Sequence, residues 1–241
     1  MSTINLDGLH SPMQPIGVIE SCFPEKFGVP RQPGLTPSAT GRIMLREPFD
    51  RPEMFRGVED FSHLWVVFLF HQAVAEGWKP TVRPPRLGGK QRRGVFATRS
   101  PHRPNHLGLS VVRLEEMVFD SPLSYLRISG IDMVDGTPVV DIKPYIAATD
   151  QPANSVPAPG EGVAEIVFSS DVQRFCRRYE ASTGRRLHAL IGEVLAQDPR
   201  PAGQRSREKE FGMLLWDVNV RWRRQADGYI VTSCERVDPP T

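Results

Sequence analysis

Short apolar segments follow one another through the first 150 residues of the chain. The run Leu64–Phe70 is apolar without alternation, which is typical of a strand that is buried on both faces or lies at the centre of a closed sheet. Further strands are predicted at Gln14–Phe23, Gly41–Leu45 and Leu109–Leu114. About seven such strands, with many turns and little helix, favour a β-sandwich or barrel over alternating strands and helices.

The pattern changes after a proline- and glycine-rich segment that we interpret as a linker. Between Ser170 and Leu195 the apolar residues follow a helical spacing that Gly184 interrupts, so we expect two helices or one bent helix. Met213–Trp222 and Tyr229–Val237 then predict a hairpin. The sequence thus predicts a mainly β protein with a small α+β domain at its C-terminal end. The expected divisions are a β domain at 1–150, the linker at 151–162 and the α+β domain at 163–241.

An Asp-Gly pair at residues 135–136 separates two apolar segments, Tyr125–Asp135 and Thr137–Ile142. Such a pair between strands predicts a β-hairpin. Asp132 and Asp141 lie near the same turn, and turn chemistry explains part of this cluster. The alternative is that one of these carboxylates accepts hydrogen bonds from a ligand.

The composition is that of a folded protein. Of the 241 residues, 39% are hydrophobic and 24% are charged, which excludes disorder throughout. No apolar run approaches the ~20 residues of a membrane span, and Met1–His10 lacks the pattern of a secretory signal. The three cysteines are far apart, which favours a reducing, cytoplasmic environment over a disulfide framework.

Basic residues gather in one part of the chain, although the net charge is only +2. Between Glu76 and Glu115 there are nine basic residues and no acidic ones. A run of one sign is typical of a surface that binds phosphates, so we expect a nucleic acid partner; the alternative is an ordinary solvated loop.

Residues 98–114 combine a polar, cationic loop, stiffened by Pro101 and Pro104, with a strand that begins after Gly108. A rigid loop that leads into a core strand can hold a ligand; the alternative is a plain surface connection. The sequence contains no Rossmann fingerprint, P-loop, zinc-protease or nucleophile-elbow motif. His102 and His106 cannot share a helix face because prolines flank them, so no metal site is predicted.

Five motifs, in this order along the chain, resemble the TsaA/TrmO-like family. They are Pro30–Leu35, Phe61–Trp65, Phe70–Gln72, Thr98–Ser100 with Arg103–Asn105 and Gly108, and Asp135–Tyr145. Asp198–Ala202 and Asn219–Trp222 are similar to the bacterial members. The resemblance implies a single-sheet antiparallel β-barrel, a small separate C-terminal domain and a homodimer. It also implies that S-adenosylmethionine donates a methyl group to N6 of threonylcarbamoyladenosine in tRNA, at the position next to the anticodon.

The resemblance also assigns roles to individual residues. Those expected to bind the cofactor are Pro30, Arg31, Gln32, His71, Gln72, Arg99, Leu109, Val134, Asp135, Gly136 and Thr137. The reaction needs an acceptor for the proton of the adenine amino group, and the candidates are Asn105, Asp141 and Tyr145. Residues expected to contact the anticodon arm of tRNA are Arg86, Arg92, Arg93, Arg103, Asp198 and Arg200.

Two departures from the family pattern bear on these roles. His106-Leu107 replaces the usual Pro-Ile, so we expect a less rigid loop, and Gly203 replaces a frequent tyrosine, so base stacking must come from elsewhere. Two alternative functions stay open: a regulatory RNA-binding protein that senses the cofactor without methyl transfer, and a methyltransferase or hydrolase of small molecules.

Overall fold

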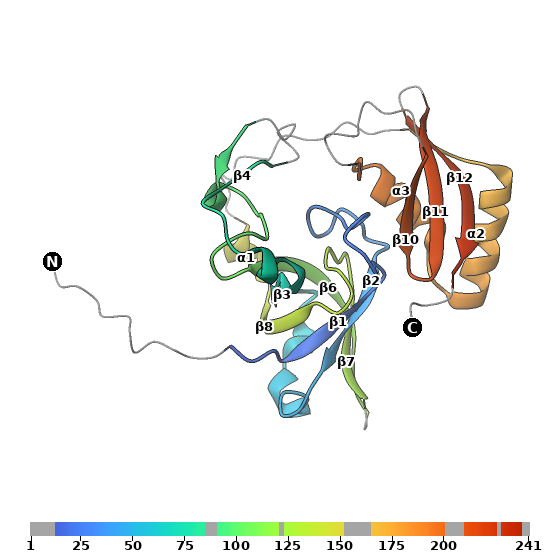
Figure 1. Ribbon diagram of the computed structural model, residues 1–241. Coiled ribbons are helices and arrows are strands. Elements are labelled where there is room, and N and C mark those ends of the chain that lie inside the picture. Colours follow the sequence, from blue (N-terminus) through green and yellow to red (C-terminus); the bar gives the residue numbers. More distant parts are fainter. Residues whose placement is uncertain are drawn as a thin grey trace, which may run out of the picture.

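A closed antiparallel barrel forms the N-terminal part of the protein (Figure 1). The computed structural model describes residues 13–84, 91–120, 123–151, 165–200, 210–225 and 228–237. The barrel strands are β1 (Gly17–Ser21), β2 (Thr40–Leu45), β3 (His63–Leu69), β6 (Leu107–Asp120), β7 (Leu123–Ser129) and β8 (Pro138–Pro144), in the order β1-β2-β7-β6-β3-β8. Pairing of β1 with β8, with Gly17 opposite Val139, closes the barrel. The mainly β, barrel-like fold predicted from the sequence is confirmed.

Strand β3 lies between β6 and β8, and its side chains alternate between the two faces of the sheet. Leu64, Val66 and Phe68 are buried, whereas Trp65 and Val67 between them are half-buried. The uninterrupted apolar run therefore has two causes. Its inner residues fill the barrel, and its outer residues belong to a partly covered surface described below.

Neighbouring strands run in opposite directions, so β1, β3 and β7 all finish at the same end of the barrel. The connections that leave from this end are residues 22–39, 70–106 and 130–137. The second connection contains η3 (His71–Glu76), a ribbon of β4 (Thr81–Val82) and β5 (Arg93–Gly94), and η5 (Val95–Ala97). The remaining short helices are η1 (Pro52–Phe55), η2 (Val58–Asp60) and α1 (Ala147–Asp150).

The Asp-Gly turn at 135–136 does not join a hairpin, so that prediction was wrong. Strand β7 pairs with β2 and β6, whereas β8 pairs with β1 and β3, and the connection 130–137 crosses the barrel end between them. The turn is anchored to the end of β1 instead. The Asp135 N–H donates to the Phe23 carbonyl at 2.9 Å, and the Asp135 carboxylate accepts from the Ser21 N–H at 2.7 Å. A local turn signal does not determine which strand the chain pairs with next.

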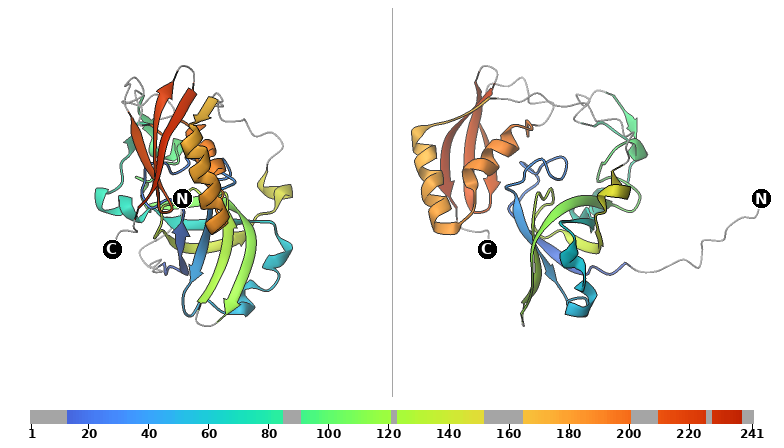
Figure 2. Two further views of the ribbon diagram at one scale, coloured as in Figure 1. Left: turned by 90° about the vertical axis from the view of Figure 1, so that its right-hand side faces the viewer. Right: turned by 180° about the vertical axis from the view of Figure 1, so that it is seen from behind.

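The C-terminal part is a four-stranded sheet with two helices against it (Figure 2). Its elements are β9 (Glu165–Phe168), α2 (Ser170–Thr183), α3 (Leu187–Leu195), β10 (Phe211–Leu215), β11 (Val218–Gln225) and β12 (Gly228–Arg236). Gly184, at φ +71°, ends α2, as the helical pattern predicted. The β11–β12 hairpin is also as predicted, but a turn at Trp216 and Asp217 divides the predicted strand before it into β10 and β11.

The first barrel connection, residues 22–39, is attached to the C-terminal part. The Trp216 N–H donates to the Cys22 carbonyl at 2.8 Å, and the Leu214 N–H donates to the Glu25 carboxylate at 3.3 Å. Glu193 of α3 accepts hydrogen bonds from the Ser38 N–H and hydroxyl at 2.9 and 2.8 Å. The C-terminal part therefore helps to hold a loop that lies at the open end of the barrel.

Gly108, at the start of β6, is a position where the backbone approaches a core side chain closely. A methyl group on its Cα would lie 2.2 Å from the ring of Phe68, which is 4% exposed. We expect Gly108→Ala to lower the free energy of unfolding by about 1–3 kcal/mol because the core is already filled there. Urea unfolding measures this change.

The matched control is Gly192→Ala in α3, where nothing lies within 4 Å of the added methyl group. Because alanine favours the helix, this variant should be about 0.5–1 kcal/mol more stable than the parent protein. Equal stability of the two variants would contradict the close approach at Gly108.

Candidate active site

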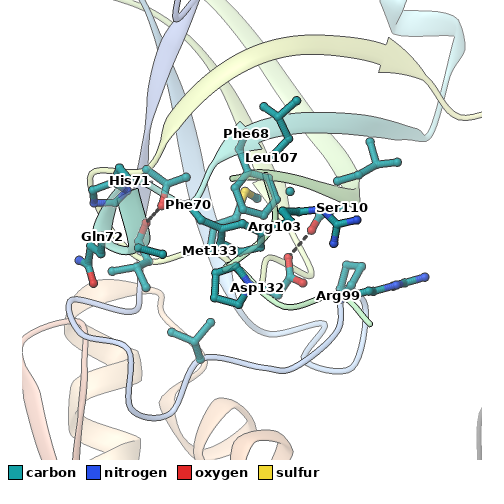
Figure 3. Close-up of a pocket in the computed structure, with 18 of the residues that line it drawn as sticks. Phe68, Phe70, His71, Gln72, Arg99, Arg103, Leu107, Ser110, Asp132 and Met133 are labelled. Atoms are coloured by element: carbon teal, nitrogen blue, oxygen red, sulfur yellow. Dashed lines mark hydrogen bonds between the residues drawn. The ribbon is translucent and has the colours of Figure 1, made fainter. Parts of the chain in front are cut away.

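A cavity of about 770 Å³ lies at the barrel end from which the three connections leave (Figure 3). Its lining comes from all three connections and from the adjoining parts of β3 and β6. Cavities that hold cofactors and small ligands commonly measure roughly 300–1,000 Å³. This cavity can therefore accept a molecule as large as a nucleoside with a long substituent.

Part of the cavity wall is apolar. The rings of Phe68 and Phe70 meet edge to face with centroids 5.0 Å apart, and Met133 lies beside them (Figure 3). Val67 and Leu109, paired across β3 and β6, extend the lining from the outer face of the sheet. This explains why β3 is apolar at its outer positions as well as its inner ones.

Charged side chains in the lining are mostly cationic. They are Lys26, Arg31, Arg99 and Arg103 against Glu76 and Asp132. Glu76 is already shared among cations, with Lys26 and Lys79 each at 3.9 Å and the imidazole of His102 at 3.7 Å. Arg99 donates to the side-chain carbonyl of Gln32, which joins the second connection to the first. The cavity therefore offers donors that suit a carboxylate or another anionic group.

Asp132 is the second carboxylate of the lining. The Ser110 hydroxyl donates to its Oδ1 at 2.6 Å (Figure 3). Burial away from water raises the pKa of Asp132 to about 6, while the Ser110 hydrogen bond and the positive charge of Arg99 act in the opposite direction.

The loop at 98–106 is held by hydrogen bonds of His106, which stands where the family usually has proline. His106 has φ +50° and is 9% exposed, and its ring nitrogen Nδ1 lies 2.8 Å from the Pro101 carbonyl. The backbone N–H of His106 donates to the Arg103 carbonyl at 3.0 Å. The His106 carbonyl accepts a hydrogen bond from the backbone N–H of Phe70 at 2.8 Å. These contacts tie His106 to Pro101, Arg103 and Phe70, and the lower rigidity expected from the sequence stays a prediction.

Most residues expected to bind the cofactor lie around this cavity. Those in its lining are Pro30, Arg31, Gln32, His71, Gln72, Arg99, Leu109, Val134 and Thr137. Asp135 and Gly136 are exposed in the turn next to it and are not part of the lining. The structure thus brings together segments that lie about a hundred residues apart in the chain.

The three candidate proton acceptors do not line the cavity. Asn105 is exposed in the 98–106 loop. Asp141 is exposed on the outer face of β8, with Lys143 at 3.6 Å. Tyr145 contacts Trp65, with ring centroids 5.7 Å apart, and its hydroxyl has no place in the lining. The structure does not bring these three side chains together at the cavity.

The residues expected to contact tRNA occupy different environments. Arg103 lines the cavity, where it donates to the Thr98 carbonyl at 3.2 Å. Arg92 and Arg93 are exposed at the β4–β5 ribbon, and Arg86 lies outside the described residues. Arg200 is 4% exposed. Only part of this set therefore forms a surface that a nucleic acid could reach directly.

Arg200 is part of a buried network that extends to the cavity. Its Nε and terminal nitrogen donate to the two carboxylate oxygens of Asp198 at 2.7 and 3.1 Å, and the same terminal nitrogen lies 3.2 Å from the Tyr229 hydroxyl. The backbone carbonyl of Asp198 accepts from Arg31 at 2.9 Å. Arg200 thus fixes a segment that in turn holds a side chain of the cavity lining.

Ser110 was not among the residues predicted from the sequence, and Asp132 was named there only as one of several carboxylates near a turn. A usable signal was present, because Ser110 interrupts the inward-facing positions of an otherwise apolar strand. Asp132 was hidden among neighbouring aspartates that turn chemistry explains equally well.

Comparison with known protein families shows to which family the chain belongs. Residues 18–151 match the model of the tRNA-methyltransferase O N-terminal domain, and residues 162–237 match the TrmO C-terminal domain. The chain belongs to the TrmO family. The resemblance predicted from its motifs is confirmed.

Relatives in this family match the TrmO chain over nearly its whole length. It is 47% identical to the tRNA (adenine(37)-N6)-methyltransferase of Escherichia coli, with 91% of this chain and 96% of that protein covered. A putative S-adenosylmethionine-dependent methyltransferase of Pseudomonas aeruginosa is 46% identical, with 87% and 91% covered. The crystal structure of TrmO from Pseudomonas aeruginosa superposes with a TM-score of 0.78 at 38% identity, over 94% of this chain and 99% of that one.

Two features are missing from the described residues. No cluster of three or more histidine, cysteine, aspartate or glutamate side chains there could hold a metal ion. Within the same parts of the TrmO chain, no helix is long and apolar enough to cross a membrane.

The Arg200 network predicts a loss of both stability and cofactor binding on Arg200→Ala. Removing one partner of a buried ion pair leaves the Asp198 carboxylate without its compensation, which costs about 3–5 kcal/mol. The variant should therefore unfold at lower denaturant concentration, and its calorimetric affinity for S-adenosylmethionine should fall because Arg31 loses its anchor. Arg93→Ala, at the exposed ribbon, is the control and should change neither quantity. Unaltered unfolding and affinity in Arg200→Ala would show that the network does not position Arg31.

Proposed function

We propose that this chain transfers a methyl group from S-adenosylmethionine to N6 of the adenine at position 37 of tRNA, the activity named for its Escherichia coli relative. The observation that carries the proposal is the cavity at the end of a TrmO-type barrel, lined by aromatic rings and by more cationic than anionic side chains. The position of the cavity at the junction of three loops leaves it open to a large substrate.

The lining residues fit the methyl donor chemically. Apolar side chains such as Phe68 and Phe70 suit its adenine, and Arg99 or Arg31 suits its carboxylate. When bound, the donor supplies a methyl group that its positively charged sulfur has already activated. The protein has to hold the two reactants in line and exclude water, and such positioning can contribute roughly 7–11 kcal/mol.

More specifically, we propose that the adenosine that is methylated is threonylcarbamoyladenosine, next to the anticodon. Its threonyl group carries a carboxylate at neutral pH, so it adds an anion to the reacting nucleoside. The lining provides four cationic side chains, more than the single carboxylate of the methyl donor requires. Arg103, which lies in the same loop as Arg99, is the residue that we assign to the substrate carboxylate.

The β4–β5 ribbon and its flanks are the surface that we assign to the anticodon arm. Arg92 and Arg93 are exposed there, and Trp78 and Phe96 are 58% and 77% exposed. Exposed aromatic rings beside guanidinium groups bind unpaired bases by stacking. They can replace the tyrosine that the chain lacks at Gly203. A tRNA substrate also agrees with the cytoplasmic location expected from the cysteine content.

The proposed active form is a homodimer. Leu109 lines the cavity and is nevertheless 53% exposed, so the outer side of the cavity is incomplete within one chain. A second copy against the outer faces of β3 and β6 would cover this apolar surface and complete the wall.

The decisive experiment is methylation of purified tRNA with a donor labelled in its methyl group. tRNA with the threonylcarbamoyl group should become labelled at position 37, and tRNA without it should be labelled at least tenfold more slowly, since Arg103 loses its anionic partner. Nucleoside mass spectrometry identifies the product. Binding of donor and tRNA without label transfer would instead support a regulatory protein, and label on small molecules alone would contradict a tRNA substrate.

The exposed aromatic residues give a separate prediction. Trp78→Ala and Phe96→Ala should each raise the KM for tRNA by roughly 5- to 100-fold, the range expected for loss of one stacked base, and leave donor affinity unchanged. Val74→Ala, at another exposed apolar residue of the same connection, is the control and should leave the KM unchanged. Sedimentation of each variant is measured in parallel. A variant that loses tRNA affinity only because it dissociates into single chains would show that its ring serves the dimer rather than the RNA.

A further inference from the structure

Methylation of an amino group must release a proton, and the residues that the sequence suggested as acceptors lie outside the cavity. Asn105 and Asp141 are exposed, and Tyr145 packs on Trp65. An acceptor has to reach the reacting nitrogen in a plausible substrate position, so it must be sought among the lining residues.

The described lining contains only two carboxylates, Glu76 and Asp132. Glu76 is half-exposed and shared among Lys26, Lys79 and His102. Among the described residues Asp132 forms no ion pair, and the Ser110 hydroxyl donates a hydrogen bond to its Oδ1 at 2.6 Å. The backbone N–H of Asp132 also favours the ionised carboxylate. A carboxylate has about four lone-pair sites, so Oδ2 can accept a further hydrogen bond from a ligand. Figure 3 shows this carboxylate among the lining side chains, between Ser110 and Arg99.

We propose that Asp132 accepts the proton which the adenine amino group loses when it is methylated; this rests on the proposed function. The nitrogen lone pair forms the new bond to the methyl carbon, and the carbon–sulfur bond breaks with its electron pair remaining on sulfur. The N–H proton passes to Oδ2 of Asp132 and from there to water after the products leave. Ser110 is a positioning residue, because it fixes Oδ1 and so orients Oδ2.

The surroundings of Asp132 suit this role. Its pKa of about 6 keeps it ionised at neutral pH, yet makes it a stronger base than an exposed aspartate. Arg99 is the charged group that acts on it directly. The other titratable side chains of the lining are Lys26, Arg31, His71, Glu76, His102 and Arg103. His71 is the alternative acceptor that the experiment has to exclude.

The test is Asp132→Asn, which keeps the shape and removes the basic oxygen. We expect single-turnover methylation to fall by about 10²- to 10⁴-fold, while calorimetry gives a donor affinity within threefold of the parent protein. In the parent protein the rate should rise with pH through about 6 and then level off, because the ionised carboxylate is the active form. This rise should disappear in the variant.

Ser110→Ala provides a graded test if Asp132→Asn fails to fold. The Ser110 hydrogen bond favours the ionised carboxylate, so its loss raises the pKa of Asp132, and the rise in rate should move to higher pH with a similar plateau. The same shift should appear in the carbon-13 resonance of the Asp132 carboxyl group of the free protein, a measurement that needs no activity. Asp120→Asn, exposed at the far end of β6, is the control and should behave like the parent protein.

The outcomes separate the possible roles. If the parent protein methylates tRNA and Asp132→Asn does so at the same rate, the inference is overturned. His71 is then the next candidate for the proton acceptor. Loss of donor affinity with an unchanged rate also overturns it, since Asp132 would then bind the ammonium group of the donor. If the parent protein itself does not methylate tRNA, the proposed function fails instead.

Discussion

Closure of the barrel between β1 and β8 is the constraint on which the rest of the structure depends. A closed antiparallel sheet of alternating strands must send every second connection to the same end, and here those connections are 22–39, 70–106 and 130–137. The cavity lies where these three meet. The same closure places β3 between β6 and β8, so that its inner residues fill the core while Val67, on its outer face, lines the cavity.

The described residues of the C-terminal part contribute to this arrangement through contacts, and none of them lies in the lining. Its sheet and α3 hold the first connection at Cys22, Glu25 and Ser38. The buried pair of Asp198 and Arg200 then holds Arg31 from the other side. The Arg200 guanidinium thus has a structural role in this arrangement, and its expected contact with tRNA stays a prediction. Through that structural role, the residue would affect activity by way of the shape of the cavity.

The distribution of charge gives the cavity its chemical character. Cations outnumber anions in the lining, and Glu76 lies 3.9 Å from both Lys26 and Lys79. Asp132 is the exception, a partly buried carboxylate that accepts a hydrogen bond from the Ser110 hydroxyl and whose pKa is raised by its loss of water. Buried groups with displaced pKa values concentrate where proteins bind or react with ligands. Such a group at the junction of three loops accords with a site built for proton transfer to or from a bound molecule.

Local patterns in the sequence by themselves determined the strands, the two helices with the glycine between them, and the family, since periodicity and motif order are properties of neighbouring residues. Through the family resemblance, the motifs at Pro30–Gln32 and around His71 and Arg99 also supplied a part of the lining, and most of the residues predicted to bind the cofactor belong to it. Only the tertiary structure decided that β7 and β8 do not pair, that Arg200 is buried, and that Asp132 rather than Asp141 faces the cavity. Each of these depends on which distant strand or loop a segment contacts in the folded chain, and the residues on either side of the segment do not determine that. Barrel closure decides the strand pairing, and packing within the C-terminal part decides the burial of Arg200.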